Sequence, residues 1–183
     1  EWETASNGYA ERSDKLYQRL CEYKGSDREQ PAPVTPSLVL VHTLAHALIR
    51  QLVFDCGYDS SALRERLYVS REDKDGGMAG FLIYTSSGDT EGTLGGLVRQ
   101  GKSGRLENTF FAAIQNSRLC STDPLCAESE GQGVYSLNYA ACHACTLLPE
   151  TSCEFGNTLL DRVSLIGAYD RPELGFFRDL AVD

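Results

Sequence analysis

Residues 37–56 read SLVLVHTLAHALIRQLVFDC, a stretch that is apolar on nearly every side of a helix. Gly57 follows at the position where a left-handed C-cap is expected. A helix that is apolar all round belongs inside a protein core rather than on its surface. The sequence therefore predicts a central buried helix over 37–56, around which the other elements pack.

The chain before this helix divides into an amphipathic stretch and a linker. Residues 14–24 carry an apolar stripe opposite charged residues, which predicts a helix capped near Ser13. Residues 25–36 are polar and contain three prolines, which favour extended backbone. The first residue is not methionine, so we expect a piece of a longer chain, organised as an N-terminal helical extension over 1–24, a proline-rich linker over 25–36 and the main domain over 37–183.

Short strands and further helices are predicted after the central helix. Residues 67–69 and 81–84 are apolar runs on either side of a turn-forming segment, so they predict a hairpin. Periodic segments predict a short helix starting at Ser60 or Ser61, a helix over 103–119 and a last helix over 157–169. The expected fold is α+β, mainly helical with a small antiparallel sheet.

Composition and charge limit the classes of function. The chain has 183 residues, of which 42% are hydrophobic, enough for one domain with its own core. No apolar run reaches about 18 residues, so we expect a cytoplasmic protein without a membrane segment. A net charge of −9 opposes a surface that tracks a phosphate backbone throughout. Any DNA contact must therefore be local. One window offers it, with four basic residues and the single acidic residue Glu107: Arg99, Lys102, Arg105 and Arg118. The alternative is that these residues only form a solvated helix face.

Five of the seven cysteines fall between residues 120 and 153, with the spacing C-x5-C-x15-C-x2-C-x7-C. Two sulfurs three residues apart in a tight turn can both bind one ion, and zinc accepts four thiolates in a tetrahedron. A buried set of free thiols or a redox C-x2-C pair are the alternatives. We favour a structural four-cysteine Zn²⁺ site built on Cys142 and Cys145, then Cys126, with Cys120 and Cys153 competing for the last position.

A histidine pair and a glycine-rich loop suggest a second polar site. His42 and His46 are four residues apart and so share one helix face, a spacing that can bind a metal. The acidic residues Asp89 and Glu91 lie in a loop of 86–96 that lacks the lysine of a phosphate-binding loop. These residues are satisfied core histidines beside an ordinary turn, a polar contact with a partner or nucleic acid, or the ligands of a metal-dependent hydrolase.

Several segments together are similar to a known family. They are LVHTLAHALIRQL (40–52), LIYTSSGDTEGTLGGL (82–97), CSTDPLC (120–126), AACHACTLLPETSCE (140–154), Asn157 and LLDR (159–162). They resemble the MrfA-type zinc-binding domain, most closely in the C-terminal part of the DrmB proteins of DISARM anti-phage systems.

This resemblance implies a zinc ion held by four cysteines and no activity of the domain's own. It implies that the domain accompanies a superfamily 2 DNA helicase, DrmA in the case of DrmB, which would carry the ATPase activity and bring the domain to DNA. The 15 residues between Cys126 and Cys142 leave the individual ligands open. A pure protein-protein adaptor without DNA contact remains the alternative to a DNA-contacting accessory domain.

Overall fold

The central element is α3, Pro36–Cys56, as the sequence predicts to within one residue. Thr35 caps it, since its hydroxyl accepts the N–H of Leu38 at 3.1 Å. Gly57 ends it in the left-handed conformation, with φ 69°, and donates its N–H to the Val53 carbonyl. By length and composition α3 could cross a membrane, but 61% of its most apolar window is buried inside the protein. That burial is what the central helix of a folded core shows.

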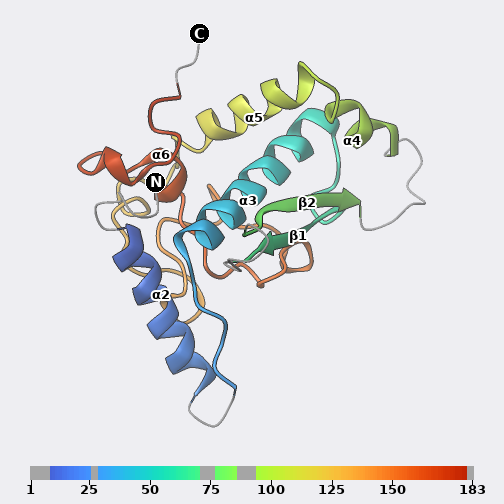
Figure 1. Cartoon of the computed structure of the whole chain (residues 1–183). Coiled ribbons are helices and arrows are strands. Elements are labelled where there is room, and N and C mark those ends of the chain that lie inside the picture. Colours follow the sequence, from blue (N-terminus) through green and yellow to red (C-terminus); the bar gives the residue numbers. More distant parts are fainter. Residues whose placement is uncertain (1–8, 26–28, 71–76, 86–93, 181–183) are drawn as a thin grey trace.

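The computed structural model describes residues 9–25, 29–70, 77–85 and 94–180. Its longer elements, in chain order, are α2 (Tyr9–Lys24), α3, β1 (Leu63–Val69), β2 (Ala79–Thr85), α4 (Leu94–Gln100), α5 (Arg105–Asn116) and α6 (Val163–Ile166). Figure 1 shows α5 along one side of α3 and the two strands along another. The predicted α+β class, mainly helical with a small antiparallel sheet, is confirmed.

The hairpin predicted from 67–69 and 81–84 is present and longer than expected. β1 and β2 pair antiparallel, from Leu63 opposite Thr85 to Val69 opposite Ala79. Alternate side chains at the start of β1, Leu63 and Glu65, point to the core face and are buried. The hairpin thereby places a carboxylate against α3.

Two predicted helices are wrong. No helix begins at Ser60 or Ser61, because the side chain of Asp59 accepts the Ser61 N–H at 2.8 Å and forms a tight turn before β1. The predicted helix over 157–169 is reduced to the four residues of α6. Residues 157–162 instead run beside 137–140, and the N–H groups that a helix would use bond there, as from Leu159 to the Leu137 carbonyl at 2.8 Å.

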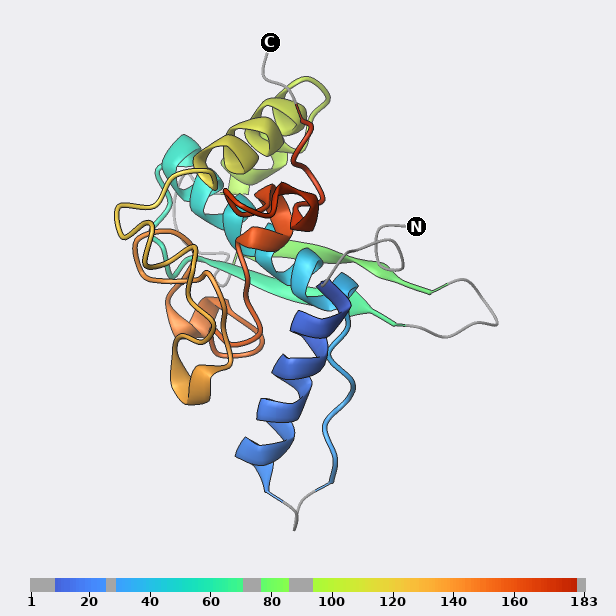
Figure 2. The ribbon, with the colours of Figure 1, turned by 90° about the vertical axis from the view of Figure 1, so that its left-hand side faces the viewer.

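The N-terminal helix α2 begins at Tyr9, earlier than the predicted 14–24, and docks against the loops that carry the cysteines (Figure 2). Tyr9 and Leu16 are fully buried in one cluster with Cys126 and Tyr139. The partner surface that an amphipathic helix requires is therefore the cysteine-bearing part of the chain. The domain boundaries expected from the sequence stay a prediction.

Candidate metal centre

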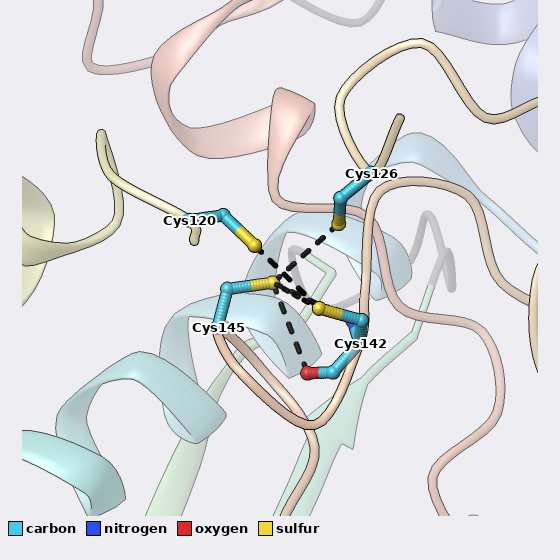
Figure 3. Close-up of side chains that lie close together, drawn as sticks. All are labelled: Cys120, Cys126, Cys142 and Cys145. Carbon is cyan, nitrogen blue, oxygen red and sulfur yellow. Dashed lines mark hydrogen bonds between the residues drawn. The ribbon is translucent and has the colours of Figure 1, made fainter. Parts of the chain in front are cut away.

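Four of the five clustered cysteines bring their sulfurs together (Figure 3). The Sγ–Sγ separations are 3.5 Å for Cys120 and Cys142, 3.7 Å for Cys126 and Cys145, and 3.7 Å for Cys142 and Cys145. A tetrahedral ion with Zn–S bonds of about 2.3 Å needs sulfurs about 3.8 Å apart. The tetrad already has the size of a zinc site. The fifth cysteine, Cys153, lies in a different cluster.

Two loops and a turn position the tetrad. Cys120 and Cys126 belong to the turns that follow α5, and Cys142 and Cys145 close a turn in which the N–H groups of Cys145 and Thr146 bond the Cys142 carbonyl at 3.2 and 2.9 Å. The intervening segment is held by a bridge in which Gln132 and Asn138 exchange both backbone hydrogen bonds. The 15 residues between Cys126 and Cys142 therefore fold back and bring both pairs of cysteines to one point.

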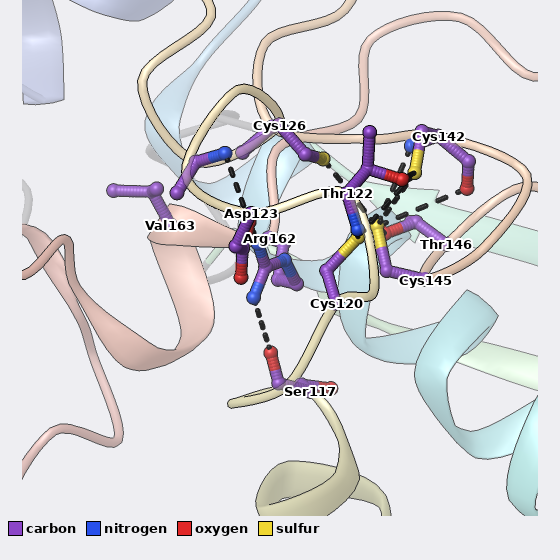
Figure 4. Close-up of polar contacts among 12 residues, drawn as sticks. Ser117, Cys120, Thr122, Asp123, Cys126, Cys142, Cys145, Thr146, Arg162 and Val163 are labelled. Carbon is purple, nitrogen blue, oxygen red and sulfur yellow. Dashed lines mark hydrogen bonds and ion pairs between the residues drawn. The ribbon is translucent and has the colours of Figure 1, made fainter.

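Every sulfur of the tetrad also lies near a polar donor, and Figure 4 draws the contacts made by Thr122 and Thr146. The donors are the Thr122 N–H to Cys120, the Gln132 amide to Cys126, the Thr122 hydroxyl to Cys142, and the Thr146 hydroxyl to Cys145, at 3.2–3.7 Å. Burial raises the pKa of Cys142, but the contacts from Thr122 and Cys120 outweigh it and lower that pKa to about 7. Burial raises the pKa of Cys126. One thiol is thus poised to ionise, while another needs a bound cation to do so.

The side chain of Arg162 supports the loop that carries Cys120 and Cys126, here called the first cysteine loop. It is almost fully buried, and its guanidinium donates to Asp123 at 2.6 Å and to the Ser117 carbonyl at 3.0 Å. Burial lowers the pKa of Arg162, but the nearby Cys145 and Asp123 outweigh it, so the pKa is raised. Four thiolates around a divalent ion carry a net charge of −2, which a buried guanidinium partly offsets.

The sequence that carries this centre is similar to those of known proteins. The model of the MrfA Zn-binding domain family matches residues 44–146, a stretch that includes all four cysteines of the tetrad and ends before Cys153. The chain belongs to the MrfA Zn-binding domain family. A curated relative, DISARM protein DrmB of Bacillus paralicheniformis, is 39% identical over 183 residues, covering 98% of this chain and 31% of the relative. The chain thus spans about a third of that relative's length.

The family resemblance and the zinc cofactor predicted from the sequence are therefore confirmed. In this MrfA Zn-binding domain, a site closed by four sulfurs leaves no position for water, as in structural rather than catalytic zinc centres.

We predict that replacing Arg162 with methionine lowers zinc affinity by roughly 10- to 100-fold, the usual effect of losing a group that orients and neutralises metal ligands. Competition with a chromophoric chelator measures the affinity. Arg64, which is exposed on β1, provides the matched control Arg64→Met. Equal zinc affinity in the two variants would contradict a role for Arg162 at the centre.

The histidine pair lies at a second, fully buried cluster of the domain. His42 and His46 of α3 meet Glu65 of β1 and Cys153. Burial lowers the pKa of His42, which favours its neutral form. Burial raises the pKa of Glu65, but the close contact with His42, followed by that with His46, outweighs burial, so this pKa lies well below its ordinary value. Asp89 and Glu91 lie outside the described residues.

Sequence reasoning missed Glu65, although a usable signal was present. The apolar run 67–69 placed the strand start too late, so Glu65 fell outside it. Extending the alternation back to Leu63 puts Glu65 on the buried face of the strand. An acidic residue at an inward strand position needs a cationic or hydrogen-bonding partner.

The predicted basic window separates into two parts. Arg99, Lys102 and Arg105 are exposed where α4 turns into α5, and none of the three forms an ion pair with another described residue. Arg118 lies beyond the other end of α5, where its guanidinium donates to the carbonyls of Phe177 and Arg178. The twelve residues of α5 span about 18 Å, so Arg118 holds the C-terminal segment at a distance from the other three.

Proposed function

We propose that Cys120, Cys126, Cys142 and Cys145 hold one structural Zn²⁺, and that the domain is a non-catalytic accessory part of a DISARM-type anti-phage assembly. In this proposal the domain acts in the cytoplasm, docks on a superfamily 2 DNA helicase of the DrmA type, and lends the assembly a local contact with DNA. The observation that carries the proposal is the closed four-sulfur centre in a domain similar to a DISARM protein.

The arrangement around the centre supports a platform. The zinc loops pack against α2, and their first loop follows directly on α5. An ion held there fixes helices that come from distant parts of the chain, because four separate positions must converge on it. The histidine pair is fully buried, so a substrate has no direct access to it, which favours the platform over a metal-dependent hydrolase.

Two neighbouring surfaces support docking and DNA contact. An apolar groove between α3, β2 and α5 is lined by residues that include Leu44, Phe81, Leu106 and Phe111. Gln100 and Gly101 also line it, so the groove borders the exposed trio of Arg99, Lys102 and Arg105. A helicase subunit seated in the groove would place its DNA beside three exposed positive charges.

Reversing the trio to glutamate tests the DNA contact in the assembled helicase complex. The expected result is weaker DNA binding, with the slope of log affinity against log salt reduced by roughly 2 to 3, because each lost phosphate contact removes about 0.9 on duplex DNA. The same reversal at Lys24, Arg64 and Arg178, all exposed and remote from the trio in the sequence, is the control for net charge.

The control variant should retain a steeper dependence of DNA affinity on salt than the variant in which the trio is reversed. An unchanged affinity and slope in a trio variant that still assembles would overturn the DNA contact. The domain would then be a protein-protein adaptor, a function that the apolar groove independently supports.

A further inference from the structure

Four metal-binding side chains meet in the interior, away from the cysteine tetrad. His42 and His46 are 0% exposed, Glu65 is 4% exposed and Cys153 is 8% exposed. Nε2 of His42 lies 3.0 Å from Oε1 of Glu65 and 3.2 Å from Sγ of Cys153. Nε2 of His46 lies 3.4 Å from the same carboxylate oxygen. Donor atoms from a helix, a strand and a loop therefore converge on one point.

The hydrogen bonds around this cluster leave lone pairs facing one another. Nδ1 of His46 lies 3.0 Å from the carbonyl oxygen of Thr146 and must donate its proton there. In the neutral imidazole, Nε2 is then an acceptor, yet it faces the acceptor oxygen of Glu65. Among the described residues, His42 Nδ1, His46 Nε2 and Glu65 Oε2 have no hydrogen-bond partner. A buried contact of this kind is satisfied by a proton or by a metal ion between the groups.

The surroundings are those of oriented metal ligands. A backbone carbonyl that accepts the second ring N–H of a histidine fixes the tautomer that presents Nε2 to a metal. The Cys153 sulfur accepts the N–H of Asn157 at 3.1 Å, and Oε1 of Glu65 accepts the N–H of Glu154 at 3.2 Å. These two contacts orient the sulfur and the carboxylate oxygen that would bind the ion.

We propose that His42, His46, Glu65 and Cys153 form a second metal site that takes a divalent ion of the zinc class. Two imidazoles, one carboxylate and one thiolate suit a borderline-soft ion in a tetrahedron. Bonds of about 2.0–2.3 Å require donor atoms roughly 3.3–3.7 Å apart, so the ion would widen the present spacing by a few tenths of an ångström. Four protein ligands in a buried position make this site structural.

One residue, Thr146, connects the two sites. Thr146 follows Cys145 directly, its carbonyl holds His46, and its hydroxyl donates to the Cys145 sulfur at 3.2 Å. Filling the buried site would therefore tie α3 and β1 to the turn that carries the cysteine tetrad. The inference goes beyond the proposed function, since the tetrad can bind zinc whether or not this site is filled.

Metal counting on the purified full chain, titrated with Zn²⁺ alone, tests the proposal. The wild type is expected to bind two equivalents, while Cys153→Ser and Glu65→Gln each retain one. The matched controls, Cys56→Ser and Glu154→Gln, change residues outside both clusters and should retain two. One saturable equivalent in the wild type that persists in both cluster variants would overturn the second site.

X-ray absorption at the zinc edge decides the matter even if a variant fails to fold. Two filled sites give the wild type an average of about 2.5 sulfurs per zinc, whereas the tetrad alone gives about 4. About 4 sulfurs in the zinc-saturated wild type would overturn the proposal. A single zinc with one sulfur and three lighter ligands would support the buried site and contradict the tetrad instead.

Discussion

Replacing Cys145 with serine is expected to remove one zinc equivalent and to abolish the cooperative thermal unfolding of the domain. Cys145 lies 3.7 Å from both Cys126 and Cys142, so its loss breaks the centre of the tetrad. Structural zinc contributes roughly 10–16 kcal/mol to folding in small zinc modules. This is comparable with the whole stability of a typical domain, about 5–15 kcal/mol. Elemental analysis and calorimetry measure the two effects.

Cys21→Ser provides the control for the loss of a thiol, because Cys21 lies on α2 outside both cysteine-containing clusters. It should keep its zinc and its transition. Chelation of the wild type is expected to reproduce the effect of Cys145→Ser, and re-addition of Zn²⁺ to reverse it. A wild type that melts at the same temperature after its zinc is removed would rule out a structural role for the centre.

Replacing Asp161 with alanine is expected to destabilise the whole domain by about 3–5 kcal/mol, the usual cost of leaving a buried charge without its partner. Asp161 is fully buried. Its carboxylate accepts the Tyr9 hydroxyl at 3.0 Å and pairs with Arg12 at 2.9 Å. At this chain length each kcal/mol lowers Tm by roughly 2–4 °C, so we expect a fall of about 6–20 °C in a thermal melt.

The exposed Asp170 offers the matched control Asp170→Ala, which should melt close to the wild type. A double-mutant cycle with Arg12→Met should give a smaller combined loss than the sum of the two single losses, because the charges are removed together. If Asp161→Ala released only α2 to proteolysis and left the remaining transition in place, α2 would be an independent extension, as the sequence suggested.

The elements that the sequence predicted well are those specified by local patterns. The apolar run of 37–56 and its glycine cap specify α3, because a helix that is apolar all round has only the core to occupy. The hairpin follows from two apolar runs around a turn. The close C-x2-C pair of Cys142 and Cys145 pointed to metal because its geometry is set within four residues.

The loss of the predicted helix over 157–169 has its physical cause in contacts between distant segments. Residues 157–162 lose their helix because 137–140 takes their backbone hydrogen bonds, a competition that no local pattern records. The side chains of LLDR at 159–162 also act through contacts with distant segments. Its aspartate fixes α2, and its arginine braces the first cysteine loop.

The sequence by itself determined the fold class, the core helix and a zinc site somewhere among five cysteines. Only the tertiary structure decided that Cys120 joins the tetrad and that Cys153 joins His42, from which it is separated by 111 positions. Spacing along the chain specifies a site when its ligands share one turn. When the ligands come from a helix, a strand and a loop, packing against the core decides which of them meet.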